Sequence, residues 1–296
     1  MASEGTGQAD SALVAALLRW YDLHERPLPW RRTSPWGVLV SEFMLQQTPV
    51  DRVLPVWAAW LARWPSPEAL AGDSVADALR AWGRLGYPRR ARWLHQSAVV
   101  LSEQHDGAVP NDPEALRALP GVGEYTTAAV LAFAFGQRSL VLDTNIRRVV
   151  SRTVSGIAQP SAHITSSERD RADTLWPRSH ARAARWSAAV MEFGALVCTA
   201  KRPACGLCPV QRTCTWTQAG QPDLPAPVAR QAQYAGSDRQ ARGRIMALLR
   251  DSPGPVGGAP LRATWSDDEQ RERALAGLVS DGLVTRLARN RYALPD

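Results

Sequence analysis

The sequence predicts an all-α protein followed by a small C-terminal module that mixes helices and strands. Apolar residues recur three and four positions apart over most of residues 11–216, as one face of a helix requires. The two-residue alternation typical of strands is scarce there and appears only near the end, in VTRLARNRYAL. With 296 residues and 45% hydrophobic content, the chain can bury a core in one two-lobed domain or in two domains.

The helical part opens on an apolar stripe formed by Leu13, Leu17, Leu18 and Tyr21. We expect residues 1–10 to be a disordered tail. The next helix follows Ser34–Pro35, a favourable start. It carries Val38, Leu39, Phe43 and Met44, and further helices are predicted over 75–82, 91–101 and 113–119.

The C-terminal part begins after a linker at 217–239, which holds three prolines and no helical period. In the module at 240–296 we predict helices over 240–250, 261–265 and 267–283, then two strands around an Arg289–Asn290 turn. Helices followed by a terminal hairpin resemble a winged helix. This resemblance leaves DNA contact and protein contact equally open.

Composition narrows the class of partner. The formal net charge is +7, which suits a polyanion without proving one, and Lys201 is the only lysine. No stretch approaches the roughly 18 apolar residues of a membrane helix, and the first ten residues lack a signal-peptide pattern. We therefore expect a cytoplasmic protein.

All four cysteines lie within residues 198–214, with spacings of six, two and five residues between them. A disulfide-stapled secreted fold would usually spread its cysteines out, so the pattern indicates a metal site. Four thiolates in one compact loop suit a 4Fe-4S cluster. Structural zinc also accepts four cysteines, so the spacing alone leaves both open.

Two further motifs carry possible chemistry: a glycine turn whose backbone could bind phosphate, and an aspartate at the start of a predicted helix. The turn Gly121–Val122–Gly123 joins two helical segments, and its two glycines can adopt positive φ and leave N–H groups exposed to a phosphate. Asp143 stands where it would cap a helix beginning at Thr144. Capping and catalysis are compatible, because both need an oriented, ionised carboxylate.

Together, LPGVGEYTTAA, VLDTNIRRV and the cysteine spacing after MEFGALVC resemble the helix-hairpin-helix superfamily of DNA glycosylases, which includes endonuclease III. The resemblance implies a two-lobed glycosylase domain over 11–216 and phosphate contact by Gly121, Val122 and Gly123. Asp143 would stabilise cationic charge on the sugar of a flipped nucleotide. The implied cofactor is a 4Fe-4S cluster on Cys198, Cys205, Cys208 and Cys214.

Members that also cleave the strand use a lysine in the second helix of the hairpin to form a Schiff base. Tyr125 stands at that position, and Lys201 lies in the cysteine loop instead. The resemblance therefore implies a monofunctional enzyme that uses water and leaves an intact abasic site.

The segment SEFMLQQT resembles adenine glycosylases that act opposite 8-oxoguanine or guanine in double-stranded DNA, and Glu42 matches their general acid. A carboxyl group between apolar residues is partly desolvated, which favours proton donation near neutral pH. A solvated stripe with Gln46 is the plainer explanation. The resemblance also assigns Tyr125 and Asn145 as polar partners of the catalytic groups.

Other matches surround these residues. Arg26, Leu28, Trp30 and Arg31 resemble the edge of the adenine pocket, although Trp30 could be core and Arg31 a solvated charge. The predicted DNA contacts around the lesion are Gln46, Gln47, Thr48 and Tyr87. The basic run Arg89, Arg90 and Arg92 suits phosphate contact or simple solvation.

The resemblance ends near residue 216. The remainder is too short and too helical for the Nudix-like domain that recognises 8-oxoguanine in most adenine glycosylases, and Ala188 stands where a polar contact to adenine is expected. Two alternatives stay open: a thymine mismatch glycosylase, for which arginines are expected in place of Gln46 and Gln47, and a non-enzymatic iron-sulfur winged-helix regulator. We expect a monomer associated with the bacterial nucleoid.

Overall fold

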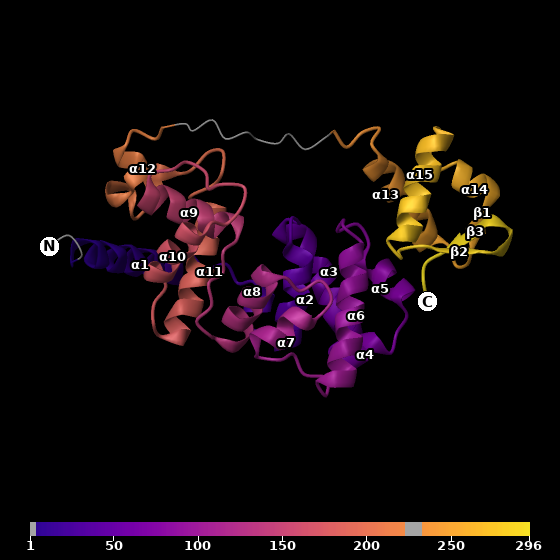
Figure 1. Ribbon diagram of the computed structural model, residues 1–296, viewed down its shortest axis with the longest axis horizontal. Helices are drawn as coiled ribbons and strands as arrows, with labels where there is room; N and C mark the ends of the chain where they lie inside the picture. Colours follow the sequence, from indigo (N-terminus) through magenta and orange to yellow (C-terminus); the bar gives the residue numbers. More distant parts are fainter. Residues whose placement is uncertain (1–3, 223–232) are drawn as a thin grey trace. The chain divides into compact units, whose positions relative to one another are not determined.

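The computed structural model describes residues 4–222 and 233–296, so the centre of the predicted linker lies outside the described residues. The chain forms two compact units that interleave along the sequence. The first comprises residues 1–38, 111–113 and 123–228, and the second comprises 39–110, 114–122 and 229–296 (Figure 1). The prediction of an all-α fold with a small α+β module is confirmed.

The first unit is helical throughout its described part. Its elements are α1 (Glu4–His24), the 3-10 turn η1 (Pro29–Arg31), the start of α2 (Pro35–Leu45), α8 (Glu124–Phe135), α9 (Thr144–Ser155), α10 (Ser166–Leu175), α11 (His180–Leu196), η2 (Cys205–Leu207), η3 (Gln211–Thr213) and α12 (Thr215–Gln218).

Helix α11 is the centre of this unit and packs on α1, α8 and α9. A side chain at Gly194 would place its Cβ 2.8 Å from Cβ of Asn145, so glycine permits the close approach of α11 to α9. Trp186 and Phe193 of the same helix are fully buried. This packing fixes the start of α9, where Asp143 lies.

The second unit contains the rest of α2 and a helical layer around buried tryptophans. Trp60 packs edge-on against Trp64 and Trp82, with ring centroids 4.6 and 5.8 Å apart. Its helices before the linker are α3 (Val50–Arg63), α4 (Pro67–Ala71), α5 (Val75–Trp82), α6 (Arg89–Gln104) and most of α7 (Pro113–Ala118).

The C-terminal module, which we call the tail, folds around its own apolar core, including Ile245, Leu249 and Leu278. A three-stranded antiparallel sheet in the order β1-β3-β2 closes it. The elements are α13 (Asp238–Asp251), β1 (Val256–Gly257), α14 (Gly258–Arg262), α15 (Asp268–Ser280), β2 (Thr285–Leu287), the turn η4 (Ala288–Asn290) and β3 (Arg291–Ala293).

Three features differ from the expectations. Helix α1 begins at Glu4, inside the stretch 1–10 that was expected to be disordered; this stretch contains no proline to stop a helix. The tail clusters with residues 39–110 rather than standing apart. In the hairpin only Gly121 has positive φ. Gly123, for which positive φ was also expected, has an extended backbone and is the N-cap of α8. Among the described helices none is long and apolar enough to span a bilayer.

Candidate active site and iron-sulfur loop

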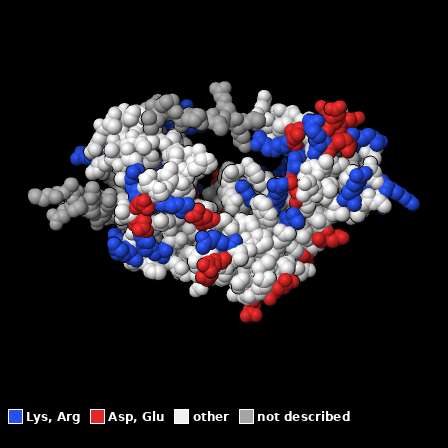
Figure 2. Space-filling view, in the orientation of Figure 1, with Lys and Arg blue, Asp and Glu red and all other residues white. Residues whose placement is uncertain are grey.

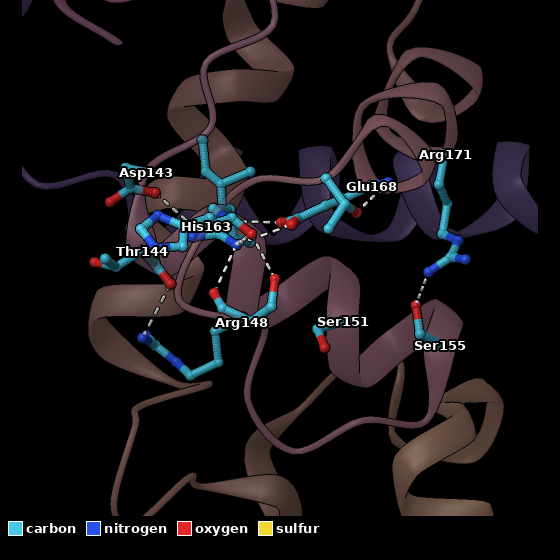
Figure 3. Close-up of polar contacts among 12 residues, drawn as sticks. Asp143, Thr144, Arg148, Ser151, Ser155, His163, Glu168 and Arg171 are labelled. Atoms are coloured by element: carbon cyan, nitrogen blue, oxygen red, sulfur yellow. Dashed lines mark hydrogen bonds and ion pairs between the residues drawn. The ribbon is translucent and has the colours of Figure 1, made fainter. Parts of the chain in front are cut away.

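Asp143 is the N-cap of α9, as predicted (Figure 3). One carboxylate oxygen accepts a 2.6 Å hydrogen bond from the backbone N–H of Ile146, and the other accepts one of 2.8 Å from the side chain of Asn145. Burial raises the pKa of Asp143 above its ordinary value, while these hydrogen bonds and the charge of Arg148 oppose that shift. The carboxylate is therefore fixed in orientation but incompletely solvated.

A second turn of α9 connects this carboxylate to the cysteine loop. Arg148 donates to Oδ1 of Asn145 at 2.8 Å, and also to the backbone carbonyls of Gly194 and Cys198. Arg152 is 2% exposed. Its three guanidinium nitrogens donate to the carbonyls of Ala158, Thr199 and Ala200, one nitrogen to each. The sequence motifs assigned no role to either arginine. Arg148 lies in the VLDTNIRRV segment, and Arg152 follows it by three residues.

The four cysteines surround one cavity, which Arg152 and Trp216 also line. All four are free thiols, and Arg152 lies 3.5 Å from Sγ of Cys198. Burial raises the pKa of Cys198 and raises that of Cys208 to about 11, so buried thiolates here need a positive partner. Within residues 4–222 and 233–296 no three ligand side chains converge as they would on a single metal ion.

Four soft sulfur ligands around a shared space fit a 4Fe-4S cluster. When bound, the cluster would supply positive charge that neutralises the thiolates and would tie the loop together. Lys201 is exposed between the first two ligands, and the guanidinium of Arg152 lies 4.6 Å from the ring of Trp216.

The predicted pocket residues are organised by a buried carboxylate. Glu192 of α11 is 3% exposed and accepts two 2.7 Å hydrogen bonds from the guanidinium of Arg26. Arg31 lies 3.1 Å from the second oxygen. Burial disfavours the charge, but the two arginines outweigh it and lower the pKa of Glu192. Trp30 lies in the same segment and is buried, while Leu28 is half-buried before it.

Glu192 is a residue that sequence reasoning missed. The available signal was a glutamate inside the apolar helix segment MEFGALVC, which resembles Glu42 in its setting. Its partner Arg26 lies 166 residues earlier in the chain, so no local sequence pattern could predict the pairing.

The hairpin turn needs its first glycine for two reasons. Gly121 has φ of +77°, and a Cβ there would lie 2.7 Å from Cβ of Trp93. Val122 is buried, whereas Gly121 and Gly123 are exposed. The backbone at the start of α8 is thereby held at the surface, as phosphate contact requires. Tyr125, in the first turn of α8, is half-buried.

In the second unit, Glu42 lies on α2 and is 5% exposed. Val38 and Leu39, which share its helix face, are also buried, so a solvated stripe with Gln46 does not describe this face. The sequence expectation of a desolvated carboxyl group matches this burial.

Gln47 and Tyr87, two of the predicted DNA contacts, share an unusual backbone conformation. Both are exposed, and both have positive φ, at 59° and 48°, which non-glycine residues rarely adopt. Arg90 connects the two segments: its guanidinium lies 4.5 Å from the Tyr87 ring and donates to the carbonyl of Gln46, the residue before Gln47. Strained, exposed residues that the surroundings fix in place are typical of functional sites.

Thr48 differs from the other predicted DNA contacts. It is 7% exposed, and its hydroxyl donates to the carbonyl of Leu85 at 3.3 Å. The side chain faces inward and ties the Gln47 loop to the segment before Tyr87. Thr48 therefore helps to position this loop, and its contact with DNA stays a prediction.

Comparison with known proteins decides the family. Residues 40–172 match the model of the HhH-GPD superfamily of base excision DNA repair proteins, and 198–214 match the iron-sulfur binding domain of endonuclease III. An adenine DNA glycosylase of Mycobacterium tuberculosis is 52% identical over 283 residues, covering 94% of this chain and 92% of the relative. The chain belongs to the adenine DNA glycosylase family.

Other matches place this glycosylase within its superfamily. A thymine/uracil-DNA glycosylase of Pyrobaculum aerophilum is 37% identical over 66% of the chain and 86% of the relative. The solved structure of a thermostable thymine-DNA glycosylase has a TM-score of 0.67 and 26% identity, and covers 73% of this chain and all of that one. The glycosylase is thus a base excision repair hydrolase of N-glycosyl bonds with an iron-sulfur cofactor, and the non-enzymatic regulator is excluded.

Proposed function

We propose that the glycosylase removes adenine mispaired with 8-oxoguanine or guanine in double-stranded DNA and leaves an intact abasic site. The observation that supports this most is the burial of Glu42 within a segment that matches the adenine glycosylases. A buried carboxyl group retains its proton more readily and can donate it to a base.

In the proposed reaction the adenine leaves the stack, and Glu42 donates a proton to N7. The C1′–N9 bond then breaks, its electron pair goes to the base, and positive charge develops on the sugar. Asp143 stabilises this charge electrostatically, held by Ile146 and Asn145. Water adds to C1′ and loses a proton, which completes hydrolysis.

The absence of an amine near Asp143 supports hydrolysis without strand cleavage. Tyr125 stands where a Schiff-base lysine would be needed, and the single lysine of the sequence is in the cysteine loop. Arg26 and Arg31, which Glu192 holds in place, would form the edge of the adenine pocket. Gln47 and Tyr87 would support the strands around the vacated position.

An excision assay tests the proposal. Purified protein is incubated with duplexes carrying A opposite 8-oxoguanine, A opposite G, or T opposite G, and the products are resolved with and without alkali. We expect alkali-dependent cleavage at adenine in the first two duplexes and none in the third. Strand breaks without alkali, trapped as a covalent complex by borohydride, would contradict the monofunctional mechanism.

The thymine glycosylase is the second candidate, because the relative from Pyrobaculum aerophilum shares 37% identity. Gln46 and Gln47 favour adenine over thymine, since arginines are expected there in thymine enzymes. Excision from T opposite G at a rate equal to that from the adenine duplexes would favour this candidate instead.

A further inference from the structure

The second unit contains a basic groove, defined by helix α13 of the tail on one wall and the segment from Gln46 to Trp93 on the other. It encloses ≈ 1090 Å³. Of the described residues that line it, eight are arginines and only Asp281 is acidic. The arginines are Arg52, Arg84, Arg89, Arg90, Arg239, Arg242, Arg244 and Arg250.

Asp281 forms contacts with both walls of the groove. Its carboxylate is 10% exposed and pairs with both Arg89 of α6 and Arg242 of α13. The backbone carbonyl of Asp281 accepts a 2.9 Å hydrogen bond from Arg92. This residue therefore joins the two walls, and among the described residues it is the only carboxylate that lines the groove.

Arg84 and Arg250 carry like charges that lie near each other in the groove. Among the described residues no carboxylate forms an ion pair with Arg84 or Arg250. Burial lowers the pKa of Arg250; the charge of the adjacent Asp251 opposes this shift, and the like charge of Arg84 adds to it. Holding such guanidinium groups together costs free energy, which an anionic ligand would offset.

The geometry of α13 indicates a long ligand rather than a small anion. Arg239, Arg242 and Arg250 are spaced by three and eight residues, which places them on one helix face. From first to last they extend over about 16 Å, at 1.5 Å per residue. One DNA strand carries a phosphate per 3.4 Å of helix axis, so this row is as long as about five phosphates.

The tail is not arranged to read DNA through α15, the helix that a winged-helix module would usually insert in the groove. Asp268, Glu269 and Glu272 are exposed in its first turns, where they would repel phosphates. Figure 2 shows acidic side chains gathered at the top of the tail, with basic ones on both sides of them. The arginines of α13 are among those that line the groove.

We infer that this groove binds the sugar-phosphate backbone of duplex DNA, so that the tail extends the DNA contact of the glycosylase domain. The inference rests on the proposed function for its ligand, because Gln47 and Tyr87 line the same groove at the predicted lesion edge. Contacts to phosphate position a protein without reading sequence, so undamaged duplex should also occupy the groove.

The test measures binding of a fluorescein-labelled, undamaged 30-base-pair duplex to the full-length protein by anisotropy across salt concentrations. The double variant R84A/R250A should bind tens of fold more weakly near 0.1 M salt. Its slope of log K against log salt should fall by about 1.8, since each lost phosphate contact contributes about 0.9.

Two controls keep the outcome specific. R273A/R286A removes the same charge from exposed arginines of the tail outside the groove, and should leave the slope nearly unchanged. R84K/R250K keeps the charge, and should retain the slope if the variants fold normally by circular dichroism. Equal losses in both alanine variants, an unchanged slope, or tighter binding by R84A/R250A would overturn the inference.

The binding assay is independent of the proposed reaction. Undamaged duplex requires no excision, so a wild-type protein that excises no adenine would refute the proposed function while leaving the groove measurement intact. Conversely, normal adenine excision with an unchanged salt slope in R84A/R250A would refute the groove alone.

Discussion

At the scale of single residues, three carboxylates differ in what stabilises their charge. Glu192 is ionised between Arg26 and Arg31 despite its burial. Asp143 has neutral donors around it, and burial raises its pKa. Glu42 is buried on an apolar helix. These environments are consistent with the three proposed tasks: holding a pocket, stabilising a cation and donating a proton.

Replacing Glu42 by Gln should lower the single-turnover rate of adenine excision by at least about 100-fold, because the amide cannot donate the proton. The substitution nearly preserves size, so the melting temperature and duplex affinity should change little. Glu103→Gln, on an exposed position of α6, is the control. An excision rate within threefold of wild type would refute the acid role.

The raised pKa of Asp143 has a consequence for pH dependence. Because the ionised form is proposed to be active, excision should fall as pH decreases through a value above the ordinary Asp pKa of about 3.9. The sign for stability follows the same shift: this group favours folding most below its unfolded pKa, and less as pH rises through the folded one. Single-turnover rates between pH 4 and 8 measure the first effect.

The matching control is Asp143→Asn, which can still cap a helix. It should lose excision at every pH while the acid side of the stability profile flattens. A wild-type excision rate that stays constant down to pH 4, with the protein still folded, would contradict an ionised Asp143 in the reaction.

At the scale of elements, the sequence predicts the helices and strands whose positions depend on residues close together in the chain. Helix α5 spans Val75–Trp82 as predicted, because its apolar spacing and its Ser74 cap are both in the sequence. Helices α13 and α15 and the β2–β3 hairpin lie close to their predicted positions, whereas α14 begins three residues before the short helix predicted at 261–265. Strand β1 was not, because two residues, Val256 and Gly257, become a strand only by pairing with β3 about 35 residues later.

The candidate site divides in the same way. Asp143 and the cysteines were found from motifs, whereas Glu192 acquires its importance from arginines far away in sequence. The inward position of Thr48 likewise depends on the carbonyl of Leu85, 37 residues later. Sequence patterns report spacing along the chain and cannot report such distant partners.

Arg152 is the element-level link between α9 and the cysteine loop, and its removal should loosen that loop. Arg152→Ala removes the side-chain donor to the carbonyls of Ala158 and Thr199, and one of two donors to the exposed Ala200, at about 1–3 kcal/mol for a buried group left unsatisfied such as Ala158. We expect the visible absorbance of the cluster and the iron content per protein to fall.

Arg152→Lys keeps the charge but can satisfy fewer carbonyls, so its iron content should lie between those of wild type and the alanine variant. Arg171→Ala, a helix α10 arginine that donates to Ser155, is a control away from the cysteines (Figure 3). Full iron content in Arg152→Ala would show that the loop holds its cluster without this residue.

At the scale of the whole molecule, the tail belongs to the same compact unit as residues 39–110. Asp281 contributes two polar contacts between them, to Arg89 and Arg92 of α6, and it also pairs with Arg242 inside the tail. Contacts this concentrated make the association of the tail sensitive to one residue, even though each part has its own apolar core.

Asp281→Ala should therefore increase amide hydrogen exchange at the start of α6 and around residues 278–283, while the interior of the tail stays protected. The two arginines would repel each other once their shared carboxylate is gone. Asp251→Ala, exposed at the end of α13, is the matched control. Identical exchange in the two variants would show that apolar contacts alone hold the tail.

The scarcity of lysine also gives this protein an internal reporter. Lys201 is exposed in the loop between the first two cysteine ligands, and no other lysine exists in the sequence. A lysine-specific protease therefore has one cleavage site in the chain, inside the loop that the cluster ties together. The rate of that single cut would follow cluster loss directly, with two fragments of predictable size as the readout.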